Sequence, residues 1–124
     1  MIDMYQEELL EHYKSPRNSG KIENPSVEFH DTNPLCGDEV TVTAKIKNNI
    51  VKNLKFESRG CAISVASASK LSEQIKGKTV NEVLKLDNQF VLDLVGVPIS
   101  AMRLKCALLS LKAIQKAIIQ YKEK

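Results

Sequence analysis

The side chains of this sequence best suited to chemistry are three thiols and one carboxylate: Cys36, Asp38, Cys61 and Cys106. Thiolates are nucleophiles and metal ligands, and a carboxylate is a harder ligand, so the set suits metal binding or sulfur chemistry. Cys36 and Asp38 share the stretch Asn33-Pro34-Leu35-Cys36-Gly37-Asp38, in which Pro34 restricts φ and Gly37 permits a turn. If a strand follows Asp38, both side chains lie at its beginning and can face one point. The alternative is three unrelated core cysteines, because free cysteine is among the most buried residue types.

The positions expected for the other two cysteines favour thiolate chemistry. Cys61 begins one predicted helix and Cys106 lies in an early turn of another, where main-chain N–H groups and the helix dipole stabilise a thiolate. Arg103 and Lys105 add positive charge beside Cys106. The spacing argues in the other direction, because the chain has no Cys-x-x-Cys, and gaps of 25 and 45 residues match neither a zinc ribbon nor a ferredoxin. The residues alone leave a metal site and unrelated thiols about equally open.

The two histidines are not expected to join these residues. His12 ends a predicted helix, where a packed or cationic ring near the C-terminus is the simpler interpretation. His30 falls on the polar face of a predicted strand and is expected to be solvated. A catalytic Cys–His pair is therefore not predicted.

Length and composition indicate one globular domain over residues 1–124. Hydrophobic residues make up 43% and charged residues 27% of the chain, which is ordinary for a water-soluble protein. Charges interrupt every apolar run, so no membrane span is expected, and the acidic N-terminus does not resemble a signal peptide. A location in the cytoplasm, where thiols stay reduced, is therefore expected, and the odd number of three cysteines also argues against a disulfide framework. A net charge of +3, with scattered lysines, gives little support for nucleic-acid binding.

The N-terminal half is predicted to contain one helix and three strands. Residues 5–13 form a short helix, which the proline and glycine of residues 15–20 terminate. Apolar and polar residues alternate, as in half-buried strands, over residues 27–31, 40–46 and 50–57. Asn48 and Asn49 tolerate positive φ and suit a tight hairpin turn. Three antiparallel strands with one face open to solvent are expected.

The C-terminal half is predicted to be helical. Residues 62–76 form a helix that Gly77 ends, and its packing face is small: Ser64, Ala68, Leu71 and Ile75. Thr79 and Glu82 suit a capping box before a short turn. Asp87 opens a short helix through residue 94, and Gly96 with Pro98 stops it.

The last helix completes the expected fold. Ser100 is a good N-cap for a helix over residues 101–121. Its apolar stripe has helical spacing and consists of Ala107, Leu111, Ile114, Ile118 and Tyr121. The chain is therefore predicted to be an α+β protein, with a small three-stranded antiparallel sheet and helices packed mainly on one face.

A set of short motifs, taken in order, gives the sequence a specific resemblance. The motifs are Tyr5, His12-Tyr13-Lys14-Ser15-Pro16-Arg17-Asn18, Asn33-Pro34-Leu35-Cys36-Gly37-Asp38, Gly60-Cys61-Ala62-Ile63-Ser64, Ala66-Ser67-Ala68-Ser69 and Arg103-Leu104-Lys105-Cys106. Together they resemble the family of IscU, the NifU N-terminal domain and SufU. No single motif is unique, but the ordered set covers nearly the whole chain.

The resemblance implies a scaffold for iron–sulfur cluster assembly and not an enzyme. A transient [2Fe–2S] cluster is built from sulfur that a cysteine desulfurase delivers, and the cluster then passes to apo-proteins. The implied ligands are Cys36, Asp38, Cys61 and Cys106, with Zn²⁺ or Fe²⁺ in the cluster-free form and a transient persulfide on Cys106 or Cys36. The SufU branch implies an alternative, a zinc-dependent sulfur acceptor that serves a desulfurase. A structural zinc-binding interaction module is a further alternative, from a different class.

Two departures from the family pattern concern the region around Cys106. IscU-type members have histidine immediately before the third cysteine, where this chain has Lys105, as SufU members do. The IscU motif Leu-Pro-Pro-Val-Lys, which an Hsp70-type chaperone recognises, corresponds to Ile99-Ser100-Ala101-Met102-Arg103 and is lost, which argues against that partner. SufU members also carry an insertion between the second and third cysteines, for which 45 residues leave no room.

Overall fold

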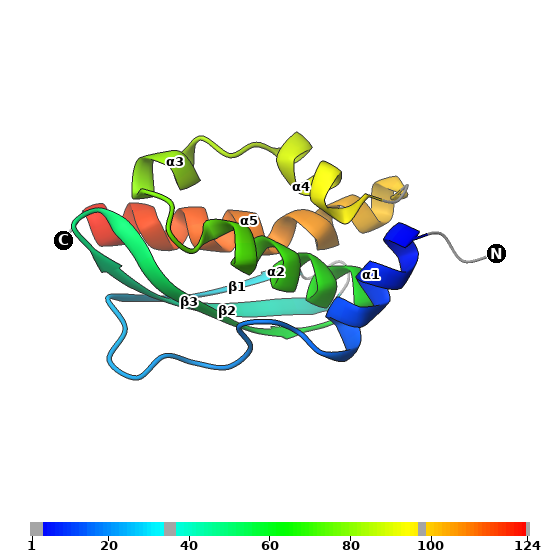
Figure 1. The fold of residues 1–124 in the computed structure, drawn as a ribbon, viewed down its shortest axis with the longest axis horizontal. Helices are drawn as coiled ribbons and strands as arrows, with labels where there is room; N and C mark the ends of the chain where they lie inside the picture. Colours follow the sequence, from blue (N-terminus) through cyan, green and yellow to red (C-terminus); the bar gives the residue numbers. More distant parts are fainter. Residues whose placement is uncertain (1–3, 34–36, 97–98, 124) are drawn as a thin grey trace.

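A three-stranded antiparallel sheet forms the base of the fold, as predicted (Figure 1). The computed structural model describes residues 4–33, 37–96 and 99–123. Strands β1 (Val27–Asn33), β2 (Asp38–Lys47) and β3 (Ile50–Arg59) lie side by side in chain order. Asn48 and Asn49 have φ values of 54° and 61°, as the predicted hairpin turn requires. Each strand is longer than predicted at one end of the sheet, and that end carries Asp38.

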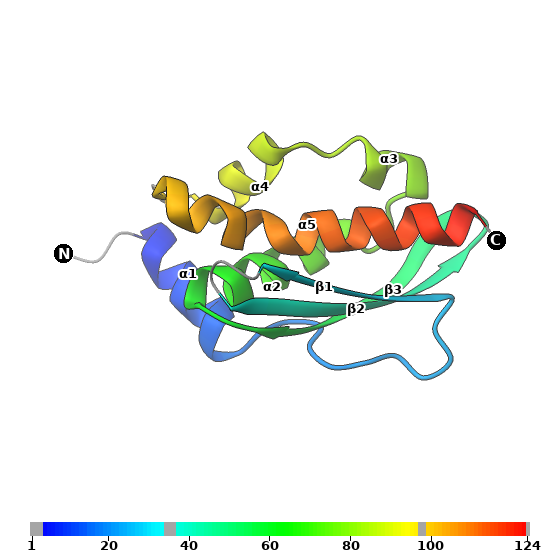
Figure 2. The ribbon, with the colours of Figure 1, turned by 180° about the vertical axis from the view of Figure 1, so that it is seen from behind.

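The helices pack on one face of the sheet, which confirms the predicted α+β class. Helix α2 (Ala62–Ile75) contacts β3, and the long helix α5 (Ala101–Lys122) contacts β1 and β2. Helix α1 (Met4–Lys14) packs against α2, while α3 (Val80–Leu84) and α4 (Asn88–Val95) cover the outer side of α5 (Figures 1 and 2). None of the described helices is both long enough and apolar enough to cross a membrane.

The predicted apolar stripes form the centre of the core. Ala107, Leu111, Ile114 and Ile118 of α5 are at most 1% exposed, and Tyr121 is partly buried against them. The predicted face of α2 is equally buried: Ser64, Ala68, Leu71 and Ile75. Burial on α5 extends beyond the stripe, because this helix lies between the sheet and the outer layer of α3 and α4.

The second face of the sheet is less open than the sequence indicated. The segment 15–26 runs across this face before it enters β1 (Figure 2). It is joined to β3 by the N–H of Gly20, which donates to the Phe56 carbonyl at 3.0 Å, and to β2 by the N–H of Ile22, which donates to Thr43 Oγ1 at 3.1 Å. Thr43 is one of the polar residues that alternate over residues 40–46 and were expected to face solvent, and it is consequently only 1% exposed.

The predicted helix caps fix where the C-terminal helices begin. Thr79 and Glu82 form a complete capping box, and Asp87 caps α4. Gly96 ends α4 in the left-handed region, whereas Pro98 lies outside the described residues. The Ser100 hydroxyl accepts a hydrogen bond from the N–H of Arg103 and starts α5. The segment that replaces the chaperone motif is therefore the beginning of α5, the helix that carries Cys106.

Candidate metal and sulfur site

Three elements that are distant in sequence bring Asp38, Cys61 and Cys106 together. Asp38 is the first residue of β2, Cys61 immediately precedes α2, and Cys106 lies in the second turn of α5. A carboxylate oxygen and the two sulfur atoms lie within 4.8 Å of one another. Cys36 lies outside the described residues.

The carboxylate of Asp38 is buried and held by the main chain. Asp38 is 2% exposed. The N–H of Cys61 donates to Asp38 Oδ1 at 3.1 Å, and Oδ2 lies 3.9 Å from the sulfur of Cys61. A hydrogen bond from the backbone therefore fixes one oxygen, and the other oxygen faces the thiol.

Gly60 makes this approach of Asp38 possible. Its φ is +147°, and a Cβ at this position would lie 2.0 Å from Asp38 Oδ1 and 2.6 Å from Cγ. Any side chain larger than hydrogen would therefore displace the carboxylate. In the sequence, the glycine in Arg59-Gly60-Cys61 marked the change from strand to helix, but its contact with a residue 22 positions earlier had no sequence signal.

Cys61 occupies the N-cap position of α2 without acting as a cap. Its φ and ψ, −73° and 166°, are those of an N-cap, and its side chain makes no capping hydrogen bond. The thiol is therefore directed to the group with Asp38 and not to the helix end. Cys61 is partly exposed, whereas Cys106 is 0% exposed. Cys61 and Cys106, the two cysteines in the described part of the chain, form no disulfide.

The positive charge expected beside Cys106 lies on the outside of α5. Lys105 and Arg103 are exposed, whereas Cys106 is buried. Consecutive helical residues point about 100° apart, so the thiol faces inward and the Lys105 side chain projects to the surface. Lys105 lines a pocket between α5 and the end of β1.

Among the described residues, the candidate group contains neither histidine. His30 is exposed, as predicted, and pairs with the Thr41 hydroxyl at 2.8 Å. His12 is a packed ring near the end of α1, with Nδ1 2.7 Å from the Ser69 hydroxyl and Nε2 3.5 Å from Glu73. Burial lowers the pKa of His12, although the carboxylate of Glu73 acts in the opposite direction.

The donor set fits a thiophilic metal. Two thiolates about 2.3 Å from a tetrahedral zinc ion lie about 3.8 Å apart, so the present group needs only a small contraction to surround one ion. The space that Gly60 leaves for Asp38 is a second sign of fit, because it lets the carboxylate approach the thiol of Cys61, which donates to Asp38 Oδ2 at 3.9 Å. The two thiols would be soft ligands to the metal, and the carboxylate would be a hard one.

Comparison with known proteins decides the family. Residues 4–124 match the NifU-like N-terminal domain. The chain belongs to this family. The family resemblance inferred from the motifs is therefore confirmed.

Individual relatives include both branches suggested by the motifs. The chain is 36% identical to the iron–sulfur cluster assembly scaffold protein IscU 1 of Archaeoglobus fulgidus, over 95% of this chain and 76% of the relative. It is also 36% identical to the zinc-dependent sulfurtransferase SufU of Bacillus subtilis, over 93% of this chain and 89% of the relative. The crystal structure of FiSufU from Fervidobacterium islandicum AW-1, named for the SUF system of cluster assembly, has 31% identity and a TM-score of 0.80, and the match covers 94% of this chain and 96% of that one.

Proposed function

We propose that this protein is a scaffold on which a [2Fe–2S] cluster is assembled from iron and from sulfur delivered by a cysteine desulfurase. The cluster then passes to apo-proteins. The proposal rests on one observation, the group of Asp38, Cys61 and Cys106 with donor atoms within 4.8 Å. Cys36, two residues before Asp38 in the sequence, is the fourth donor that the proposal assigns.

The placement of the donors suits temporary binding. A scaffold must hold its cargo firmly enough to build it and loosely enough to release it. Three thiolates provide soft ligands, and the single carboxylate is a harder, more easily exchanged one. The three described donors belong to the beginning of a strand and the beginnings of two helices, and Cys61 is partly exposed, so a second protein can reach the group from outside.

Sulfur enters as a persulfide on Cys106 or Cys36. The acceptor thiolate attacks the terminal sulfur of the desulfurase persulfide, a new S–S bond forms on the acceptor, and the desulfurase cysteine leaves as a thiolate. Because Cys106 is 0% exposed, transfer to it requires a local opening at the start of α5.

The second candidate function is that of a zinc-dependent sulfur acceptor. Two features favour it: a donor group compact enough for one ion, and Lys105 in place of the histidine before Cys106. A protonated lysine has no lone pair for a metal, so the ligand set is limited to the three thiols and the carboxylate. Such a protein would carry persulfide sulfur and build no cluster.

Anaerobic reconstitution separates the two functions. Metal-free protein is incubated with a cysteine desulfurase, L-cysteine, ferrous iron and a dithiol, which reduces the persulfide sulfur to sulfide, and the visible charge-transfer absorption of a [2Fe–2S] cluster is followed. Cluster absorption supports the scaffold. No cluster absorption there, persulfide on a cysteine of this chain in a parallel reaction without the dithiol, and tight binding of one added zinc ion per chain would replace the scaffold with the sulfur acceptor.

Gly60→Ala tests the site without removing a donor. The new Cβ displaces Asp38, so we expect at least about a tenfold loss of zinc or ferrous-iron affinity. Gly77→Ala is the matched control, because Gly77 also has positive φ, +90°, but nothing lies within 4 Å of its added Cβ. Affinity would be measured by competition with a coloured chelator. Equal loss in both variants would mean that backbone strain, and not the position of Asp38, controls binding.

A further inference from the structure

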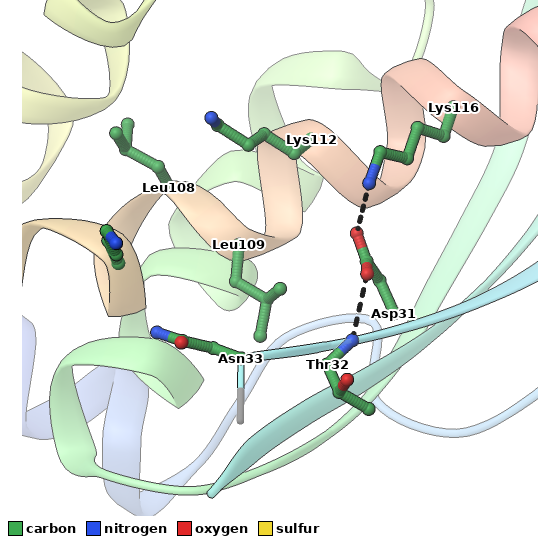
Figure 3. Close-up of a pocket in the computed structure, with 8 residues that line it drawn as sticks. Asp31, Thr32, Asn33, Leu108, Leu109, Lys112 and Lys116 are labelled. Atoms are coloured by element: carbon green, nitrogen blue, oxygen red, sulfur yellow. Dashed lines mark hydrogen bonds and ion pairs between the residues drawn. The ribbon is translucent and has the colours of Figure 1, made fainter. Parts of the chain in front are cut away.

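A pocket of about 210 Å³ lies beside the candidate site, between the end of β1 and α5 (Figure 3). Its lining includes Asp31 from β1 and, from α5, Leu108, Leu109 and three lysines: Lys105, Lys112 and Lys116. Nothing in the proposed function requires this pocket. Its composition, cationic side chains above apolar ones, is that of a site for an organic anion.

The side chains that line the pocket carry a net positive charge. Lys116 forms an ion pair with Asp31, with 3.1 Å between Nζ and Oδ2. Lys105 and Lys112 have no ion-pair or hydrogen-bond partner among the residues that the structure describes. Two cationic groups therefore remain available at one pocket, and the single carboxylate of the lining is already engaged.

Apolar side chains supply the other part of the lining. Leu108 and Leu109 are 5% exposed each, and Figure 3 shows Leu109 directed from α5 towards β1. Both side chains already pack in the core, and a bare inorganic anion would leave their exposed edges uncovered. An anion with a short hydrocarbon part would use both the lysines and the leucines.

The spacing of Lys105 and Lys112 favours a ligand with two anionic groups. Lys105 and Lys112 are seven residues apart on one helix, which is two turns and a rise of about 10.5 Å. One carboxylate meets both amines only if both long side chains bend towards each other. Two carboxylates separated by a few carbon atoms can pair with one lysine each.

We propose that this pocket binds a free dicarboxylic acid of about four or five carbon atoms, with one carboxylate on Lys105, the other on Lys112, and the carbon chain against Leu108 and Leu109. An acidic side chain of a docked protein offers a carboxylate too, but only one, so the pair of lysines favours the free acid. Because Lys105 adjoins Cys106, and Asn33 of the lining pairs with Asp38 across β1 and β2, the bound acid is a neighbour of the thiol site.

The test is a calorimetric titration of the full, metal-free chain with glutarate. We expect saturable binding of one glutarate per chain, with no heat from the neutral analogue glutaramide and weaker binding of inorganic phosphate. Lys112→Gln should weaken glutarate binding about tenfold, since it removes one charge-assisted contact. Lys52→Gln, at an exposed lysine of β3, is the matched control and should leave the affinity unchanged.

Three results would overturn the proposal: no saturable glutarate binding, equal losses in Lys112→Gln and Lys52→Gln, or phosphate binding as tight as that of glutarate. A loss of affinity for the desulfurase in Lys112→Gln, with no saturable glutarate binding to the wild type, would assign the lysines to protein docking and overturn the free-acid assignment. Failure here would leave the proposed function intact, because the titration contains no metal, sulfur or cluster.

Discussion

Helix α2 has two contact surfaces of opposite chemistry. Its apolar contact, made by Ala66, Leu71 and Ile75 against β3 and α5, consists of residues that are 0% exposed. Its polar contact, made by Ser69 and Lys70 towards α1, is buried almost as deeply, at 2% and 7% exposed. The same helix therefore combines an ordinary core face with a buried set of hydrogen bonds and ion pairs.

The partners in the polar contact come from α1 and the segment after it. The Ser69 hydroxyl lies 2.7 Å from His12 Nδ1 and accepts a hydrogen bond from the N–H of Arg17, also at 2.7 Å. Lys70 Nζ lies 3.3 Å from Glu8. Leu9 is the only buried hydrophobic residue among the described side chains of α1. Attachment of α1 thus depends on polar groups to a degree that the rest of the fold does not.

This difference between the two contacts predicts that pH and salt affect the attachment of α1 more than they affect the thiol site. Cys61 and Cys106 lie at the beginnings of α2 and α5, which are joined to the sheet by the apolar contact. Burial of apolar area depends little on pH or salt, whereas ion pairs and a buried histidine respond to both. We therefore expect the position of α1 to vary with conditions while the two thiols remain in place.

The largest expected effect comes from breaking the apolar contact. Leu71→Ala removes a fully buried side chain and should lower the free energy of unfolding by about 2–5 kcal/mol. Urea unfolding followed by circular dichroism measures the change. Leu10→Ala is the control, because Leu10 on α1 is 45% exposed and should cost less than about 0.5 kcal/mol. Similar costs for the two variants would contradict the comparison.

The apolar contact could be predicted from the sequence, whereas the polar contact could not. Leu71, Ile75 and the stripe of α5 repeat with helical spacing, so periodicity alone predicts their burial. Lys70 and Ser69 carry no such signal, because their burial results from α1 packing over them. His12 was predicted as a packed or cationic ring, but its partners on α2, 57 residues later in the case of Ser69, are set by tertiary structure.

The candidate site also has one part that the sequence predicts and another that depends on tertiary structure. Cys61 and Cys106 could be placed at helix beginnings because Gly60 and Ser100 are strong local signals. Their approach to Asp38 requires β3 to extend to Arg59 and β2 to begin at Asp38, and strand ends are poorly defined by alternation. The covering of the second sheet face by segment 15–26 was missed for a related reason, since an irregular segment has no period.

Removal of the Ser69 hydroxyl should break the polar contact at its centre. Ser69→Ala leaves the partly buried N–H of Arg17 and the buried ring of His12 without their common partner, at a cost of about 1–3 kcal/mol in unfolding free energy. Ser67→Ala is a matched control on the same helix, because the buried Ser67 hydroxyl has no hydrogen-bond partner among the described residues. That variant should be neutral or slightly stabilising. A neutral Ser69→Ala would show that water replaces the hydroxyl.

The pH dependence of the polar contact should have a smaller effect on stability than Ser69→Ala, and stability should fall as the pH decreases. Burial lowers the pKa of His12 below 6.5, opposed by Glu73 and Glu8 and assisted by Arg17 and Lys70. The unfolded chain then binds the proton more readily, so stability is complete above about pH 6.5 and falls as the pH decreases from there towards the lowered pKa. Unfolding curves between pH 8 and 5 measure the loss, which His12→Asn should remove. A rise in stability on acidification would contradict it.

The ion pair between Lys70 and Glu8 should contribute least. Glu8 is 48% exposed, so solvent screens the pair, and Glu8→Gln should cost about 0.2–1 kcal/mol at low salt. Lys70 is only 7% exposed, which keeps the cost above zero, because a nearly buried ammonium group loses its counter-charge. The difference between wild type and Glu8→Gln should disappear in 1 M salt, where the screening length is about 3 Å. Glu7→Gln, at an exposed neighbour on α1, is the control. A cost that persists in 1 M salt would show that the pair acts through hydrogen bonding inside the polar contact, and its effect would then belong with that of Ser69.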